Sequence, residues 1–279
     1  MIIFKKSDEI NRYLSKELAN HQSIGFVPTM GALHEGHLSL IRQSNKDNQI
    51  TVCSIFVNPT QFNNPEDFKK YPISIEDDIQ MLENEHCSIL FLPSVDEIYP
   101  GEFVKKHYDL GELENILEGK YRPGHYQGVC MVVDRLLSII PSQKLYLGQK
   151  DYQQCMVIEK MVTQRNYNIQ IEIMPTIRED DGLAMSSRNR RLNESDRKKS
   201  LAINKALLHI KNNLSKSDRN KLIADAEQML ITSGFDVDYI EILQSDLSPI
   251  DQNSNNKKWV ALIAATIGNI RLIDNMILN

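Results

Sequence analysis

The 279-residue sequence predicts an α/β protein in which a large domain with a parallel sheet precedes a smaller α+β domain. Two observations lead to this prediction. Short β-branched runs alternate with amphipathic helical patterns as far as about Pro175, and from about Asn193 polar helices are followed by alternating strands. A chain of this length buries about three quarters of its unfolded surface, so it can support both domains.

The first domain is expected to contain strands that are joined by helices. The predicted strands are Ser23–Val27, Ile50–Val57, Ser88–Leu92, Lys144–Leu147 and Ile169–Met174. The predicted helices are Leu38–Ser44, Ile75–Asn84, Val129–Ile140 and Tyr152–Gln164. Strands joined in this way pair in parallel, and ligands of such sheets bind beyond the carboxyl ends of the strands. The loops that follow the strands are therefore the place to expect a site.

The second domain is expected to hold two helices and three strands, at Glu194–Leu214, Asp218–Thr232, Val237–Leu243, Trp259–Thr266 and Ile270–Asp274. The last two strands should form an antiparallel hairpin, because Gly268 in the turn can take a positive φ. We place the domains at residues 1–176 and 177–279.

Composition excludes several classes of protein. Hydrophobic residues at 41% and charged residues at 25% are typical of a globular chain. With 32 Lys and Arg against 37 Asp and Glu, the net charge of -5 gives no general attraction to nucleic acid or to an anionic membrane. The most apolar stretch is much shorter than the ~20 residues that span a bilayer, and charges interrupt the N-terminus, so we expect a cytoplasmic protein. Four widely spaced cysteines without a C-x-x-C pair predict reduced thiols.

The loop after the first predicted strand is the first candidate for a site. It reads P-T-M-G-A-L-H-E-G-H over residues 28–37, and a helix begins beside its second histidine. Glycines allow a ligand to approach the backbone closely, and the N–H groups at a helix N-terminus bind phosphate. His34 and His37 are three residues apart, so on a helical turn they share a face and can contact one phosphate chain.

Two other interpretations of this loop stay open. H-x-x-H can be half of a zinc site, although His86, His107 and His125 show no spacing that supplies the remaining ligands. The loop can also be structural, with both histidines facing solvent. It differs from the zincin motif, in which the histidines are four residues apart on a helix.

Polar side chains also follow three of the other predicted strands. Asn58 and Gln61 are neutral amides, which suit recognition of a small polar substrate. Lys150 can neutralise phosphate charge, and Asp151, as a helix cap, can accept hydrogen bonds from ribose hydroxyls. Gln154 lies one turn later, where it can face the substrate. The S-S-R run at residues 186–188 can clamp β- and γ-phosphates. Taken singly, each has an ordinary structural alternative: a turn, a cap or a polar linker.

Together these loops are rich in phosphate donors and contain no obvious acid–base pair of carboxylates and no nucleophile–base dyad. They indicate nucleotide chemistry driven by positioning and charge stabilisation. The sequence contains neither the P-loop pattern nor G-x-G-x-x-G after a strand, so a P-loop ATPase and a dinucleotide dehydrogenase are disfavoured. The remaining interpretation is attack on the α-phosphate of ATP.

The sequence resembles the pantothenate synthetases along nearly its whole length. The shared motifs are P-T-M-G at 28–31 with H-E-G-H at 34–37, F-V-N-P-T-Q-F at 56–62, R-P-G-H at 122–125, G-Q-K-D at 148–151, S-S-R-N at 186–189 and L-I-D-N at 272–275. The H-x-G-H loop alone would resemble the wider nucleotidylyl-transferase superfamily. The resemblance implies a Rossmann-like first domain, a second domain that forms a lid over the site, and a homodimer.

The resemblance further implies a ligase that works in two steps. The pantoate carboxylate attacks the α-phosphate of Mg·ATP to give pantoyl adenylate and diphosphate, and the amine of β-alanine then displaces AMP. ATP is thus a co-substrate, accompanied by Mg²⁺, and no nucleic acid or membrane takes part. A pocket of neutral amides fits this reaction, because an acyl adenylate must meet an uncharged amine while water is kept away.

Roles for individual residues follow from the same resemblance. The implied catalytic residues are His34, His37, Lys150, Ser186, Ser187 and Arg188, with His37 as the nominal general acid at the leaving diphosphate. The implied ATP-binding residues are Met30, Gly31, Ala32, Leu33, His34, Glu35, Gly36, His37, Gly148, Gln149, Lys150, Asp151, Ile177, Met185, Ser186, Ser187 and Arg188. The residues implied to bind pantoate are Asn58, Gln61 and Gln154, and Gln61 also borders β-alanine.

One position departs from the family pattern. Ile73 stands where the family usually has arginine after proline, so it cannot supply that charge. Asp77 and its neighbour match acidic positions near the family's magnesium, and Asp77 is the expected metal ligand. The alternative is that both acids only favour the helix dipole. Glu118 and Arg122 are expected to form a structural ion pair that supports the site.

Two functions of other classes remain as alternatives. A nucleotidylyltransferase would keep the adenylylated molecule as its final product and release no AMP when an amine is added. A regulatory protein with this fold would bind ATP or zinc without any turnover.

Overall fold

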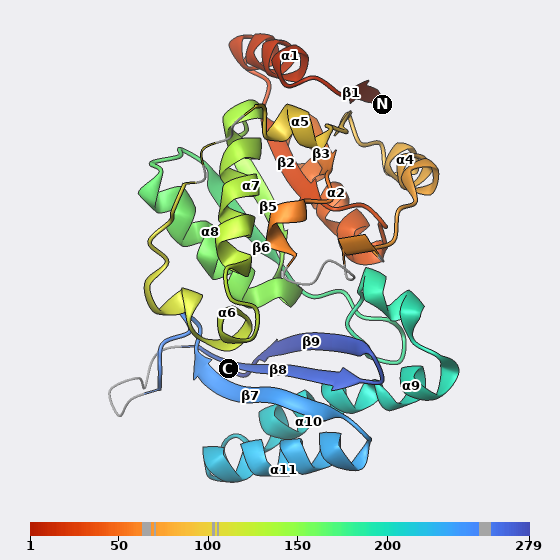
Figure 1. Ribbon diagram of the computed structural model, residues 1–279, viewed down its shortest axis with the longest axis vertical. Coiled ribbons are helices and arrows are strands. Elements are labelled where there is room, and N and C mark those ends of the chain that lie inside the picture. Colours follow the sequence, from red (N-terminus) through yellow and green to blue (C-terminus); the bar gives the residue numbers. More distant parts are fainter. Residues whose placement is uncertain (63–67, 70, 102–103, 105, 251–257) are drawn as a thin grey trace. The chain divides into compact units, whose positions relative to one another are not determined.

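The structure is a computed structural model that describes residues 1–279 except 63–67, 70, 102–103, 105 and 251–257. The chain forms two compact units (Figure 1). The first unit comprises Met1–Gly148 and Gln154–Pro175, and the second comprises Gln149–Gln153 and Thr176–Asn279. Among the described residues, no helix is both long enough and apolar enough to cross a membrane.

Within the described residues, the first unit holds a six-stranded parallel sheet in the order β1-β4-β3-β2-β5-β6. Its strands are β1 (Ile2–Phe4), β2 (Ile24–Thr29), β3 (Ile50–Ile55), β4 (Ile89–Phe91), β5 (Lys144–Gly148) and β6 (Gln170–Met174). The predicted parallel sheet is therefore confirmed. The edge strand β1 was not predicted, because three residues are too few to show a periodic pattern.

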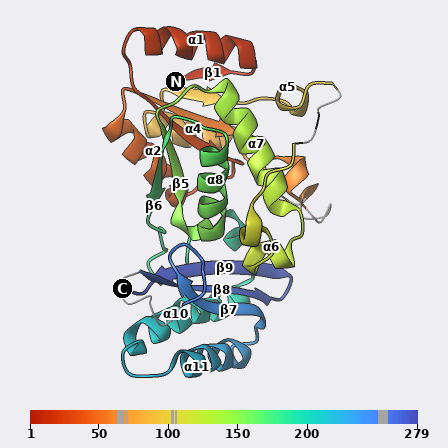
Figure 2. The same ribbon diagram turned by 90° about the vertical axis from the view of Figure 1, so that its left-hand side faces the viewer.

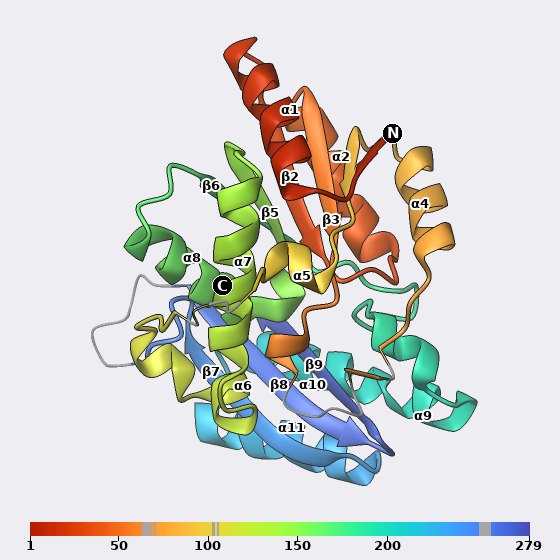
Figure 3. The same ribbon diagram turned by 45° about the horizontal axis from the view of Figure 1, so that its top comes forward.

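Helices cover both faces of this sheet. They are α1 (Ser7–Ala19), α2 (Glu35–Asp47), α4 (Ile75–Asn84), α5 (Val95–Ile98), α6 (Leu117–Tyr121), α7 (His125–Ile139) and α8 (Tyr152–Gln164), with the 3-10 turns η1 (Pro59–Gln61) and η2 (Gly111–Glu114). Phe26 of β2 packs in one core with α1, α7 and α8, while its neighbour Val27 packs in another with α2 and α4. Figure 3 shows α7 and α8 on one side of the strands and α2 and α4 on the other.

The order of the strands brings the candidate loops to one edge of the sheet. β2 lies between β3 and β5, and all three run in parallel. Their carboxyl ends, at Thr29, Ile55 and Gly148, are therefore neighbours. The 28–37 loop and the turn η1 both begin at this edge, as the sequence predicts.

The second unit holds an antiparallel sheet of β7 (Asp236–Gln244), β8 (Trp259–Ile267) and β9 (Ile270–Ile277). The remaining elements are η3 (Gln149–Asp151), η4 (Ser187–Arg191), α9 (Glu194–Lys199), α10 (Leu201–Asn213) and α11 (Arg219–Thr232). Helices α10 and α11 pack on one face of the sheet and share its apolar core (Figure 2). The predicted β8–β9 hairpin is confirmed, with Gly268 at a φ of 56° in the turn.

One helix of the second unit differs from the prediction. Glu194–Leu214 is not continuous, because α9 ends and α10 begins at Ser200. The Ser200 hydroxyl donates a hydrogen bond to the carbonyl of Arg197 at 2.7 Å. Serine hydroxyls that bond nearby carbonyls compete with helical hydrogen bonding and bend helices, which explains a break that hydrophobic spacing does not show.

Candidate active site

The two histidines of the 28–37 loop lie side by side. His34 caps the N-terminus of α2, and its Nδ1 accepts a hydrogen bond from the Gly36 N–H at 3.2 Å. With Nδ1 acting as an acceptor, the neutral ring carries its proton on Nε2, which is then a donor. The ring centroids of His34 and His37 are 4.1 Å apart, as their three-residue spacing predicts. Glu35, between them, forms an ion pair with Arg42.

The loop before these histidines is held by a buried carboxylate. Asp78 of α4 is fully buried and accepts the N–H groups of Ala32 and Leu33, each at 2.8 Å. The Ser74 hydroxyl donates to the same carboxylate at 3.2 Å. Hydrogen bonds to an ionised acceptor are about twice as strong as neutral ones, so Asp78 fixes the course of this loop.

The conformation of the loop explains one of its glycines. Gly31 and Ala32 have φ values of 80° and 49°, in the left-handed region. A Cβ on Gly31 would lie 2.9 Å from an Asp78 carboxylate oxygen, so this position requires glycine. Because the N–H groups of Ala32 and Leu33 already bond Asp78, other atoms of these two residues would have to make their implied ATP contacts.

Asn58 and Gln61 form a connected pair on η1. The Asn58 side-chain amide donates to Oε1 of Gln61 and to the carbonyl of Gly128, each at 3.1 Å. Nε2 of Gln61 donates to the Met30 sulfur at 2.9 Å. A thioether is a weak acceptor, so a ligand oxygen can replace it at small cost. Asn58 is only 1% exposed, so in this structure it holds Gln61 in place more than it offers itself to a ligand.

α7 supports this pair from behind. Nδ1 of His125, a buried residue, lies 2.8 Å from the carbonyl oxygen of Gln61. Gly128 lets η1 approach the helix, since a Cβ there would lie 2.4 Å from the Thr60 carbonyl oxygen. Both residues are part of the support for Gln61. In the sequence His125 was considered only as a possible zinc ligand and as part of a shared motif.

The remaining predicted residues of the first unit are more separate. Gly148 ends β5, and its carbonyl accepts from the Cys155 thiol at 3.5 Å. Gln154 is partly buried on α8, and within the described residues its side chain makes no hydrogen bond to Asn58 or Gln61. The predicted ion pair of Glu118 and Arg122 is confirmed, with 3.7 Å between Oε2 and Nη1.

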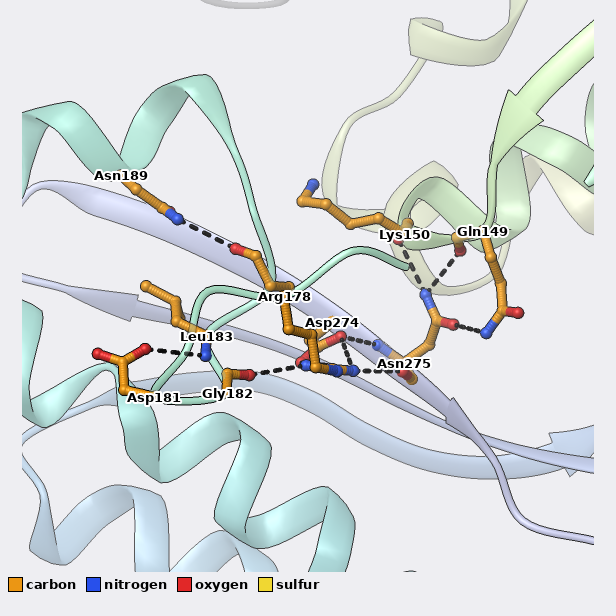
Figure 4. Close-up of polar contacts among 10 residues, drawn as sticks. Gln149, Lys150, Arg178, Asp181, Gly182, Leu183, Asn189, Asp274 and Asn275 are labelled. Carbon is orange, nitrogen blue, oxygen red and sulfur yellow. Dashed lines mark hydrogen bonds and ion pairs between the residues drawn. The ribbon is translucent and has the colours of Figure 1, made fainter. Parts of the chain in front are cut away.

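In the second unit, the Q-K-D residues at 149–151 are held against the last strand (Figure 4). The Asn275 amide donates to the carbonyls of Gln149 and Lys150, each at 2.9 Å, and Gln149 Nε2 donates back to Asn275 Oδ1 at 3.0 Å. Lys150 Nζ lies 3.5 Å from an Asp151 carboxylate oxygen.

The segment before η4 folds back on itself. The Met185 N–H donates to the Ile177 carbonyl at 3.0 Å, so these two predicted ATP-binding residues lie together. Ser186 caps η4 by accepting the Arg188 N–H at 3.2 Å, and Ser187 is buried. Hydroxyls and a guanidinium are thus gathered on one short turn.

The acids expected near magnesium point in different directions. Asp77 is exposed on the first turn of α4, whereas Asp78 faces inward toward the loop. Among the described residues, no group of three or more His, Cys, Asp or Glu side chains gathers to hold a metal ion. A magnesium ion at Asp77 would therefore have phosphate oxygens and water as its other ligands.

Side-chain donors and cations dominate the predicted site residues in each of the two units. Imidazoles, an ammonium group, two hydroxyls and a guanidinium suit a polyphosphate, and the amide of Gln61 suits a small polar acid. The sequence shows Asp78 as an acid beside Asp77 and the pair Asp274 and Asn275 as part of a shared motif, but it did not reveal their supporting roles. Two adjacent polar residues within an otherwise apolar strand were the signal that could have revealed that pair.

Comparison with known proteins agrees with this chemistry. The family model described as pantoate-beta-alanine ligase matches residues 2–277. A pantothenate synthetase of Cytophaga hutchinsonii is 44% identical over 284 residues, covering 100% of this chain and 99% of the relative. One from Dehalococcoides mccartyi is 47% identical over 259 residues, covering 91% of this chain and 96% of the relative.

Solved structures agree with the fold as well. Pantothenate synthetase from Thermus thermophilus superimposes with a TM-score of 0.92 at 36% identity, covering 99% of both chains. Pantoate-beta-alanine ligase from Francisella tularensis, solved with beta-gamma ATP and beta-alanine, has a TM-score of 0.83 at 38% identity, covering 99% of this chain and 97% of that one. The chain belongs to the pantoate–β-alanine ligase family.

Proposed function

We propose that this chain condenses (R)-pantoate with β-alanine at the expense of ATP, giving pantothenate, AMP and diphosphate. The observation that carries the proposal is the family match over residues 2–277. It is supported by the Francisella tularensis relative, which was solved with an ATP analogue and beta-alanine. The side-chain donors described above suit the triphosphate of ATP.

In the first step, a pantoate carboxylate oxygen attacks the α-phosphorus of Mg·ATP, and the bond from that phosphorus to the diphosphate oxygen breaks. His34 and His37 donate to the phosphates, and His37 gives a proton to the leaving diphosphate. Lys150 neutralises charge, while Ser186, Ser187 and Arg188 hold the β- and γ-phosphates. Donors fixed in this way stabilise the charge that builds up in the transition state.

The second step releases AMP. The uncharged amine of β-alanine attacks the acyl carbon of pantoyl adenylate, the bond to the AMP oxygen breaks, and the amine loses a proton. Gln61, Gln154 and Asn58 form the pantoate pocket, and Gln61 also borders β-alanine. Neutral amides serve here because a charged partner would compete for the β-alanine carboxylate and hold water near the adenylate.

The setting of the reaction belongs to the same proposal. Asp77 would hold the magnesium ion that accompanies ATP, and the ion would supply positive charge at the phosphates. The domains at 1–176 and 177–279 act together, the second as a lid over the first. The working form is a cytoplasmic homodimer.

A product assay tests the proposal. Purified protein is given Mg·ATP with pantoate and β-alanine together, and then with each acid omitted in turn. We expect AMP release that needs both acids, with pantothenate formed in equal amount. Formation of a stable adenylylated product, with no AMP released when β-alanine is added, would favour a nucleotidylyltransferase. ATP or zinc binding without turnover by folded protein would favour a regulatory role.

A further inference from the structure

The last strand of the chain carries two adjacent buried polar residues. Asp274 and Asn275 lie on β9 and are 4% and 2% exposed. Consecutive residues of a strand point to opposite faces, so each of the two must find its partners on a different side. Those partners are the Gln149–Lys150 turn and the segment that begins at Arg178. Gln149 and Lys150 belong to the ATP-binding set that the resemblance implies, and Arg178 lies between two of its members, Ile177 and Met185.

Asn275 holds the main chain of the turn rather than its functional side chain. One amide N–H₂ group donates to two successive carbonyls, those of Gln149 and Lys150, and the Gln149 side chain returns a hydrogen bond. Figure 4 shows the Lys150 side chain extending away from Asn275 while its carbonyl faces it. The ammonium group therefore remains available for a ligand.

Asp274 holds the second segment through an ion pair. Its carboxylate oxygens accept Nη1 and Nη2 of Arg178 at 2.7 and 3.0 Å. The same guanidinium donates to the Gly182 carbonyl at 3.1 Å and to the Asn275 carbonyl at 3.3 Å (Figure 4). Arg178 thus closes the hairpin that returns the chain to Met185 and the donors that follow it.

We propose that Asp274 and Asn275 are positioning residues for adenylate formation, which keep Lys150 and the Ser186–Arg188 turn at a fixed spacing. This inference rests on the proposed function. Lys150 and the turn act on the same triphosphate, and misplacement by about 1 Å can cost about 100-fold in rate. After diphosphate leaves, that triphosphate no longer exists, so the second step depends much less on the spacing.

The critical variant is Asn275→Asp, because it keeps the size of the side chain and removes its donor. A carboxylate would then face the carbonyl oxygens of Gln149 and Lys150 and repel the turn. The matched control is Asp238→Asn, which breaks an ion pair with Arg271 of 2.6 Å in the same sheet. Both substitutions exchange one oxygen and one amide nitrogen.

Two half-reactions separate positioning from general damage. Pantoate-dependent exchange of labelled diphosphate into ATP follows the first step, and aminolysis of synthetic pantoyl adenylate by β-alanine follows the second. We expect Asn275→Asp to lower the exchange rate about 100-fold and to leave aminolysis within about threefold, a difference near the limit of such assays. Asp238→Asn should leave both rates close to those of the wild type.

Other results would overturn the inference. Equal exchange rates in Asn275→Asp and Asp238→Asn would do so, and so would a parallel fall of both half-reactions in Asn275→Asp protein that melts like the wild type. If Asn275→Asp does not fold, Asp274→Asn weakens the other half of the same support and must show the same split, or the inference fails. A wild-type chain with no exchange at all would instead overturn the proposed function, and this inference with it.

Discussion

Each unit of this molecule holds its own predicted site residues with a buried aspartate, but the two aspartates work differently. Asp78 in the first unit accepts two main-chain N–H groups of the 28–37 loop. Asp274 in the second unit accepts the guanidinium of Arg178, a side chain that is itself 23% exposed. Both contacts join segments that are far apart in the sequence, but Asp78 holds main-chain groups whereas Asp274 holds a side chain.

This difference decides whether each contact mainly stabilises its unit or mainly positions the predicted site residues. Main-chain N–H groups cannot turn away, so without Asp78 they would stay buried and unsatisfied. Arg178 can reach water if Asp274 is lost. Burial raises the pKa of Asp274 above its usual value in spite of Arg178 beside it, so burying this charge costs much of what the ion pair returns. Asp78 should therefore matter for folding and Asp274 for the geometry of the site.

The largest expected effect comes from Asp78→Asn. An amide offers one acceptor oxygen to two N–H donors, so one of them faces an N–H₂ group. We expect the free energy of unfolding of the first unit to fall by about 2–3 kcal/mol and diphosphate exchange to fall at least about 100-fold. Urea denaturation followed by circular dichroism measures the first effect. Asp77→Asn on the same helical turn is the control for stability and should cost less than about 1 kcal/mol; equal losses would remove the special role of Asp78.

A smaller loss of stability is expected from Asp274→Asn. Arg178 keeps one acceptor and gains water, so the second unit should lose about 1–2 kcal/mol, the usual net value of such hydrogen bonds, while exchange falls about tenfold. Trp259 is the chain's one tryptophan and lies on β8, so its fluorescence follows unfolding of the second unit alone. A loss of stability as large as that of Asp78→Asn, with unchanged exchange, would reverse the comparison.

The next prediction concerns a packing contact that involves no charged group. Gly128→Ala places a Cβ 2.4 Å from the Thr60 carbonyl oxygen and 2.8 Å from Gln61 Cα. Overpacking of this kind typically costs about 1–3 kcal/mol, and the displaced Gln61 should raise the KM for pantoate several-fold. Ser138→Ala, at an exposed position of the same helix, is the control. If the KM does not change in folded Gly128→Ala protein, η1 does not depend on its contact with α7.

The smallest effect is one of pH, and it has the opposite sign in the two units. Although burial alone would raise it, hydrogen bonds from Tyr167, Arg165 and Tyr108 hold the pKa of Asp134 on α7 below its usual value. A lowered pKa gives stability that is complete above the unfolded value near 4 and is lost as the pH falls through the folded value. The raised pKa of Asp274 works the other way. Its contribution is complete below the unfolded value near 4 and is lost as the pH rises through the higher folded value.

Denaturation between pH 2 and 6 measures this contrast. Below about pH 4, the first unit should lose stability with acid, and Asp134→Asn should flatten that loss. The second unit, followed by Trp259 fluorescence, should gain stability from Asp274 as the pH falls toward about 4 from above, with no further gain below that value. Parallel curves in the wild type and in Asp134→Asn would show that Asp134 contributes nothing to the acid response.

Much of the fold follows from periodicity, because burial imposes it. The predicted bounds of α4 and α8 agree with the structure to the residue, since their apolar positions and ends are clear in the sequence. Short or interrupted elements of secondary structure could not be predicted. β1 has only three residues, and the break at Ser200 depends on one hydroxyl contact rather than on hydrophobic spacing.

The residue types that the reaction requires could be predicted from the sequence. The direction in which each side chain points could be predicted less well. The spacing of His34 and His37 indicated that they share a face, and their rings do lie together. Asp77 and Asp78 looked equivalent as acids. Yet Asp78 stands three residues after Ile75 and four before Leu82, so helical periodicity places it on the buried face of α4. That signal was present in the sequence, whereas its partners at Ala32 and Leu33 depend on tertiary packing.

We infer that a carboxylate is joined to the α-phosphate of ATP before any amide forms. Pantoate labelled with ¹⁸O in its carboxylate tests this order of steps, with AMP analysed by mass spectrometry after a full turnover with β-alanine. We expect one ¹⁸O atom in each AMP molecule, because the acyl–oxygen bond breaks in the second step. Unlabelled AMP together with labelled diphosphate or phosphate would contradict it.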